Sequence, residues 1–145
     1  MKMKNIVVVS ALLCAMLLLG ACQILDNAAK LQEYDFGSDK VPTINAVVGE
    51  RKVTGVETST TNGAPQKQYT YSSTSVTSDL ASYAQHLRDH GWIVTQDYNF
   101  YTIPGSAQLA KESADDGKVL VLSIAYENAK YAIKISKIEG TLEMK

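Results

Sequence analysis

Cysteine is scarce in this chain, and both copies lie near the amino terminus. Among 145 residues, only Cys14 and Cys22 are cysteines. The sequence after residue 22 therefore has no thiol nucleophile, no cysteine pair for a disulfide and no thiolate metal ligand. A domain built from that part must be stabilised by its apolar core, and the supply of Val, Ile, Leu and Tyr is adequate for one.

Clusters of basic residues are also lacking. The formal net charge is −1, from 14 basic and 15 acidic residues, and no run of Lys or Arg stands out. Nucleic-acid-binding proteins neutralise phosphates with such runs, so we expect no nucleic-acid partner. The chain is long enough for one domain with a real core and too short for two.

The chain has no hydrophobic run long enough for a comfortable membrane span. Residues 6–19 are apolar, which is shorter than the roughly 20 residues that a spanning helix needs. Lys2 and Lys4 precede this run. A short basic region followed by an apolar region of this length is typical of a secretory signal peptide.

The apolar run closes on Leu19-Gly20-Ala21-Cys22. This arrangement resembles the lipobox of bacterial lipoproteins. The resemblance implies cleavage between Ala21 and Cys22, removal of residues 1–21, and a diacylglycerol on the Cys22 thiol. An ordinary signal peptide ending near Ala21 and an uncleaved anchor are the alternatives. Each buried methylene contributes about 0.8 kcal/mol, so two or three acyl chains hold a protein stably on a membrane.

The same resemblance bears on location. The protein is expected to be exported and lipid-anchored, either to the cell membrane or to the outer membrane of a bacterium. Gln23 follows the lipidated cysteine, and the absence of Asp there is compatible with transfer to an outer membrane. Residues 22–40 are mixed and polar, and predict a lipidated tether; a flexible segment of this length spans about 25 Å.

Residues 41–145 predict a single α+β domain, in which one main helix packs on a mostly antiparallel β-sheet. Apolar positions recur at helical spacing and predict that helix at about residues 78–90, with Gly91 just past its end. Strand patterns cover residues 41–48, 51–58, 66–72, 92–96, 119–126 and 130–138, with weaker ones at 100–103 and 107–112. A loop is expected at residues 58–65.

Motifs for chemistry are weak. His86 and His90 are spaced i, i+4 on the predicted helix, but the glutamate of a zinc helix is missing, so two surface histidines are favoured and no metal site is expected. Tyr126 and Lys130 match a dehydrogenase spacing across a hairpin rather than along a helix, and no cofactor is expected. Asp115 precedes Asp116 and Gly117 in what we interpret as a solvated turn.

Aromatic residues give the best remaining candidate for a binding surface. Tyr98, Phe100 and Tyr101 lie within four residues, which is more aromatic surface than one strand face can bury. Tyr and Trp are enriched at binding hot spots. The competing interpretation is that these side chains fill the core under the helix.

Taken together, these features favour a non-enzymatic, membrane-anchored binding module of the cell envelope. Its expected partners are the membrane, through the lipid on Cys22, and an envelope protein, a glycan or a peptide. Two alternatives remain open. The first is a hydrolase-like enzyme with His86 or His90 as base, and the second is a structural spacer in an envelope complex.

Overall fold

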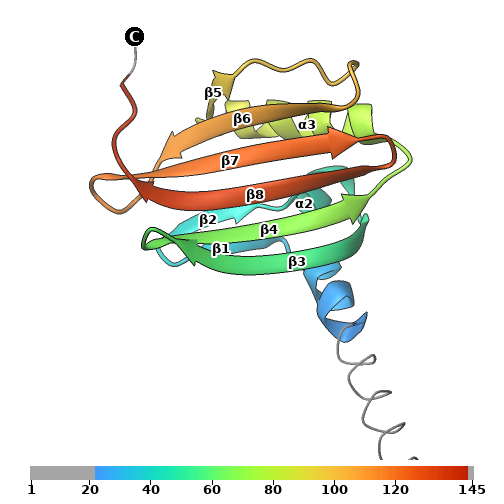
Figure 1. The fold of residues 1–145 in the computed structure, drawn as a ribbon, viewed down its shortest axis with the longest axis horizontal. Helices are drawn as coiled ribbons and strands as arrows, with labels where there is room; N and C mark the ends of the chain where they lie inside the picture. The colour runs from blue at the N-terminus through green and yellow to red at the C-terminus, as the bar shows by residue number, and fades with distance from the viewer. Residues whose placement is uncertain (1–21, 144–145) are drawn as a thin grey trace, which may run out of the picture.

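The computed structural model describes residues 22–143 and is organised around a six-stranded antiparallel sheet (Figure 1). The signal peptide expected at residues 1–21 lies outside the described residues. In spatial order the strands of the sheet are β3 (Lys52–Thr61), β4 (Ala64–Ser72), β8 (Lys130–Glu139), β7 (Lys118–Glu127), β6 (Gly105–Glu112) and β5 (Ile93–Gln96). The predicted mixed fold with an antiparallel sheet is confirmed.

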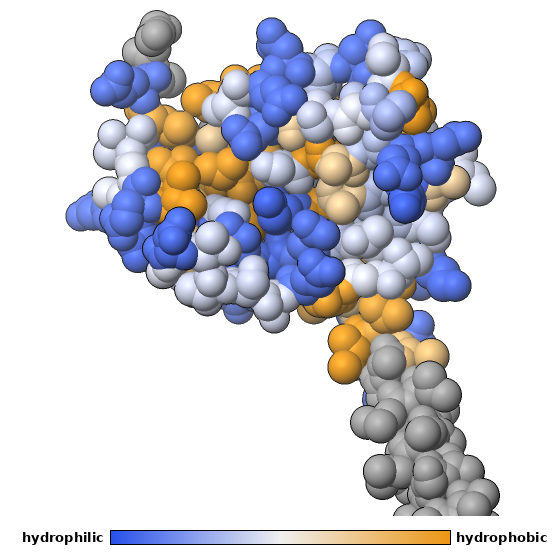
Figure 2. Space-filling view, viewed as in Figure 1, coloured by the Kyte–Doolittle hydropathy of each residue, from blue (hydrophilic) through white to orange (hydrophobic). Residues whose placement is uncertain are grey.

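The two carboxy-terminal strands follow the alternation in their sequence. Ile133 and Ile135 of β8 are fully buried, whereas Lys134 between them is exposed. Successive side chains of a strand point to opposite faces, so this alternation places the isoleucines in the core. The other face of the sheet is less exposed to solvent than predicted. Val119 of β7, which pairs with Ile138 of β8, is buried on that face. Figure 2 shows apolar patches among polar side chains on the face of the molecule that is turned to the viewer.

The main helix, α3 (Val76–Asp89), packs on the inner face of the sheet (Figure 1). It begins two residues before the predicted start, with Ser75 as its N-cap. It ends at Asp89, one residue before the predicted end, and Gly91 lies just past that end as predicted. Gly91 has a φ of +90°, its N–H donates to the Arg88 carbonyl, and the Trp92 N–H donates to the Leu87 carbonyl. This pair of hydrogen bonds is the Schellman motif, which favours glycine at that position.

The segment expected to be a tether is instead part of the folded unit. Residues 22–30 are helical, and β1 (Glu33–Phe36) pairs with β2 (Asp39–Pro42) in a separate hairpin. Tyr34 and Phe36 are buried in the same core as α3. The polar residues that suggested a flexible tether alternate with these aromatic side chains, and the alternation matches a strand with one buried face.

Other elements differ from the sequence prediction. The strand expected at residues 41–48 breaks after Pro42, and α2 (Ile44–Val48) follows, capped by Thr43. Residues 100–103 form a loop, not a strand. The expectation of one main helix therefore holds only loosely. No helix within residues 22–143 has the length and apolar character needed to cross a bilayer.

The loop expected at residues 58–65 is much shorter. Asn62 and Gly63 have φ values of +51° and +77°, and β3 and β4 continue up to this two-residue turn. Positive φ at both central residues defines the type I′ turn, in which Asn-Gly is favoured. The Ser and Thr residues that suggested a loop lie in the exposed edge strand β3.

Candidate functional site

The three predicted aromatic residues are divided between core and surface. Phe100 is only 5% exposed; its ring stacks on Tyr98 at 4.4 Å and meets Tyr126 edge-on at 5.3 Å. Phe100 is therefore not available to a partner, which corrects that part of the prediction. The reason is that the loop after β5 places the Phe100 ring in the core, against Tyr126 of β7. Tyr98 is half-buried, and Tyr101 is 87% exposed.

The loop that carries Tyr101 is braced on both sides. The Tyr101 N–H donates to the Asn99 side chain over 3.0 Å, and the Tyr126 hydroxyl donates to the Asn99 carbonyl over 3.0 Å. From the helix side, the Thr77 hydroxyl donates to the Phe100 carbonyl over 2.9 Å. These bonds tie the loop to β7 and to α3, so the exposed phenol is held on a fixed support.

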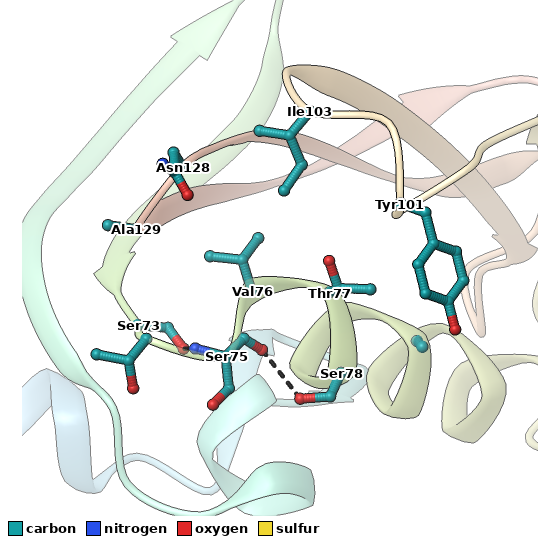
Figure 3. Close-up of a pocket in the computed structure, with 11 residues that line it drawn as sticks. Ser73, Ser75, Val76, Thr77, Ser78, Tyr101, Ile103, Asn128 and Ala129 are labelled. Carbon is teal, nitrogen blue, oxygen red and sulfur yellow. Dashed lines mark hydrogen bonds between the residues drawn. The ribbon is translucent and has the colours of Figure 1, made fainter.

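Tyr101 borders a pocket at the start of α3, which we call the α3 pocket (Figure 3). The pocket has a volume of about 450 Å³. Its walls come from the first turn of α3, the loop around Tyr101, and the β7–β8 turn. The lining residues are Ser73, Thr74, Ser75, Val76, Thr77, Ser78, Ala81, Tyr101, Ile103, Asn128 and Ala129.

The α3 pocket combines polar and apolar groups. Figure 3 shows Ile103 and Asn128 on one side and Val76 and Thr77 on the other. The Ser75 side chain makes no capping hydrogen bond to the helix. Pockets that bind small ligands or peptide side chains are lined in this way, with apolar walls and a few oriented polar groups.

A buried polar network is connected to the α3 pocket through Ser73, which lines the pocket and belongs to the network. Arg51 clamps the Asp79 carboxylate with two hydrogen bonds, Nε to Oδ2 at 2.8 Å and Nη2 to Oδ1 at 2.7 Å. Ser73 donates to the same carboxylate over 2.6 Å, and Tyr131 donates over 3.0 Å. Asp79 is 2% exposed. The network joins α3 and β8 to the residue before β3 and the residue after β4.

The charge state of this network follows from its contacts. Burial by itself raises the pKa of Asp79, but the hydrogen bonds from Arg51, Ser73 and Tyr131 outweigh burial and hold that pKa below its ordinary value. Burial, and then the nearby Asp79 charge, raise the pKa of Tyr131 far above its ordinary value. Asp79 is therefore ionised and Tyr131 neutral at neutral pH, which is the state a stable structural ion pair needs.

Most tyrosines of the chain are structural. Six of the eight are buried, namely Tyr34, Tyr69, Tyr71, Tyr83, Tyr126 and Tyr131. The hydroxyls of Tyr34 and Tyr71 lie 2.5 Å apart, and the Tyr83 hydroxyl donates to the Pro42 carbonyl over 2.8 Å. Buried phenols require such partners. Tyr101 thus differs from the other tyrosines in being directed to solvent.

A second buried ion cluster fixes the β1–β2 hairpin to the sheet. Lys137 is 7% exposed and pairs with Asp39 at 2.8 Å and with Asp115. Asp39 also accepts hydrogen bonds from the Ser113 hydroxyl and the Ala114 N–H. The turn at residues 115–117, interpreted from the sequence as solvated, is therefore partly a docking point for β1–β2.

His86 of α3 and His90, the C-cap residue of that helix, lie side by side. Their rings stack with centroids 4.2 Å apart, and His90 Nδ1 lies 2.7 Å from the His86 carbonyl oxygen. Across residues 22–143, no group of three or more His, Cys, Asp or Glu side chains could hold a metal ion. Neither imidazole is hydrogen-bonded to a carboxylate or hydroxyl group in that part of the chain, so no triad-like arrangement supports a base role.

Sequence reasoning missed both buried ion clusters. Arg51 and Asp79 are 28 residues apart, and Asp39 and Lys137 are nearly 100 apart. Such pairs leave no local spacing signal. Asp79 was recognisable only as an acidic residue in the first turn of a helix. Comparisons add no further assignment: no known family model, curated protein or solved structure matches this chain.

Proposed function

We propose that this chain is a membrane-anchored bacterial lipoprotein and that its folded domain is a non-enzymatic binding module of the cell envelope. The anchoring rests on Leu19-Gly20-Ala21-Cys22 after an export-type leader. Cys22 itself is exposed and is not in a disulfide. An accessible thiol at the start of the folded part is compatible with covalent lipidation at that position.

The binding role rests on one observation, the exposure of Tyr101 beside the α3 pocket. A large aromatic side chain that is 87% exposed contributes nothing to the core, yet its loop is held by hydrogen bonds on two sides. A partner would therefore meet a pre-positioned aromatic group and lose little conformational freedom on ordering it. The partner proposed is an envelope protein, a glycan or a peptide.

Anchoring is tested by expressing the full chain in a bacterium and comparing it with the Cys22→Ser variant. We expect the parent to remain with the membrane fraction and its amino-terminal peptide to carry the mass of a lipid. The Cys22→Ser variant should lose both properties. An unmodified Cys22 in the parent, or a variant that keeps the lipid mass, would overturn the proposed anchoring.

Binding is tested by affinity capture with crosslinking from solubilised envelope of the native organism, using the full chain as bait. Parallel baits carry Tyr101→Ala or, as a matched control, Ile138→Ala. The control shortens a partly exposed apolar side chain on the face of the sheet that is turned away from α3. We expect one specific partner that is retained with Ile138→Ala and lost with Tyr101→Ala. A partner captured equally by all baits would point to a spacer role with a different contact surface.

A further inference from the structure

The amino-terminal helical segment is locked to the domain at its far end. Asn45 of α2 donates from Nδ2 to the Ala29 carbonyl over 2.9 Å and to the Arg51 carbonyl over 3.0 Å. The Thr43 hydroxyl donates to the Leu31 carbonyl over 2.7 Å. Ala28 and Ala29 are buried in the core. From residue 28 onward, the backbone is therefore held against the rest of the domain.

The distance from this lock to Cys22 is short. Residues 22–30 are helical, and a helix rises 1.5 Å per residue, so six residues span about 9 Å. A flexible tether from residue 22 to 40 would have spanned about 25 Å. An acylated Cys22 has to lie at the bilayer surface. The folded domain therefore begins about 9 Å from the headgroups, which is less than two turns of helix.

The surface around Cys22 suits this contact. Ile24 is 61% exposed, two residues after the cysteine. Cys22 and Leu25 also border a cavity of about 320 Å³, together with Val53 of β3 and the charged residues Asp26, Glu50 and Lys52. Figure 2 shows apolar side chains gathered where this segment leaves the domain. Moving an exposed isoleucine next to a lipid anchor into the headgroup–acyl boundary removes its apolar surface from water, which is favourable.

We propose that residues 22–30 hold the domain against the lipid surface in one orientation, with Ile24 inserted beside the acyl chains. This inference rests on the proposed lipidation of Cys22. It assigns the two edges of the sheet to different environments. The β3 edge, which adjoins Cys22, faces the membrane, and the β5 edge faces away (Figure 1). Five strand spacings separate the two edges by about 24 Å.

The orientation is tested with fluorescent probes on single cysteines. After removal of residues 1–21 and acylation of Cys22, the mature chain has no other thiol. The full chain is expressed as Glu50→Cys or Asp97→Cys, labelled, and reconstituted into phosphatidylethanolamine–phosphatidylglycerol vesicles that contain a headgroup quencher. Glu50 adjoins Cys22, and Asp97 follows β5; both are exposed. We expect the Glu50→Cys probe to lose most of its emission and the Asp97→Cys probe to lose little.

A matched control restores slack without disturbing the fold. About twelve Gly and Ser residues inserted after Gln23 add a mean reach of about 20 Å. In this variant we expect the difference between the two probes to disappear. Equal quenching of both probes in the parent, with lipid mass on Cys22, would overturn the orientation and leave the anchor intact. Absence of lipid on Cys22 would overturn both proposals, so the two failures are distinguishable.

Discussion

The Tyr131 hydroxyl donates a hydrogen bond of 3.0 Å to the Asp79 carboxylate, although 52 residues separate them. It fixes the start of β8 to the first turn of α3. Arg51, the residue before β3, holds the same carboxylate. Three segments distant in sequence thus meet at one buried charge. Ser73, which lines the α3 pocket, donates to this carboxylate as well, so Asp79 helps to hold one wall of the pocket.

Replacing Asp79 with Asn removes the charge and keeps the shape. We expect Asp79→Asn to lower the free energy of unfolding by roughly 2–4 kcal/mol at pH 7, because Arg51 loses its partner and the remaining donors face a weaker acceptor. Urea denaturation measures the loss. The matched control is Asp89→Asn at the exposed end of the same helix, where we expect a change of less than about 0.5 kcal/mol.

The same variant gives a pH test. The pKa of Asp79 in the folded chain lies below its ordinary value of 3.8. A carboxylate with a lowered pKa contributes its stability above the unfolded pKa, and that contribution is lost as the pH falls through the folded pKa. The stability gap between parent and Asp79→Asn should therefore be full at pH 7 and shrink below about pH 4. A gap that stays constant from pH 7 to pH 3 would contradict this assignment.

Lys137 is expected to control docking of the β1–β2 hairpin. Lys137→Met removes the cation that pairs with Asp39 and Asp115 and donates to the Phe36 carbonyl over 3.2 Å. Asp39 then stays buried without its counterion, which is costly. We expect faster amide hydrogen exchange in residues 33–42 and little change in β7. Lys134→Met, on the exposed face of the same strand, is the control; equal effects of the two variants would refute the role of Lys137.

Gly105 is expected to be irreplaceable for steric reasons. A Cβ at this position would overlap the phenol of Tyr126, which anchors the Tyr101 loop through Asn99. Gly105→Ala should cost roughly 1–3 kcal/mol, as for overpacking. Gly55→Ala is the matched control, because a Cβ there would lie 3.7 Å from Thr70, an ordinary contact. Thermal unfolding of both variants measures the difference, and equal melting temperatures would show that Tyr126 moves freely.

Local patterns in the sequence predicted the parts of the fold that depend on local physics. The β7–β8 hairpin and α3 with Gly91 show strong periodicity or a specific cap, and the structure has both. The segment before residue 41 was misjudged, because Tyr34 and Phe36 are buried by elements far along the chain. The different burial of Phe100 and Tyr101 was missed for the same reason. Nothing in the local sequence indicates which of the two neighbouring aromatic side chains packs against Tyr126.

That difference in burial gives the final prediction. Phe100→Ala should destabilise the domain by about 3–5 kcal/mol, because it empties a core site between Tyr98 and Tyr126. Tyr101→Ala should change stability by less than about 0.5 kcal/mol, since its side chain is 87% exposed. Chemical denaturation of both variants checks the pair. If Tyr101→Ala proves as destabilising as Phe100→Ala, the phenol has a structural role and the loss of a captured partner could not be assigned to a binding surface. If only Phe100→Ala destabilises, Tyr101→Ala is a folded protein with one aromatic contact removed.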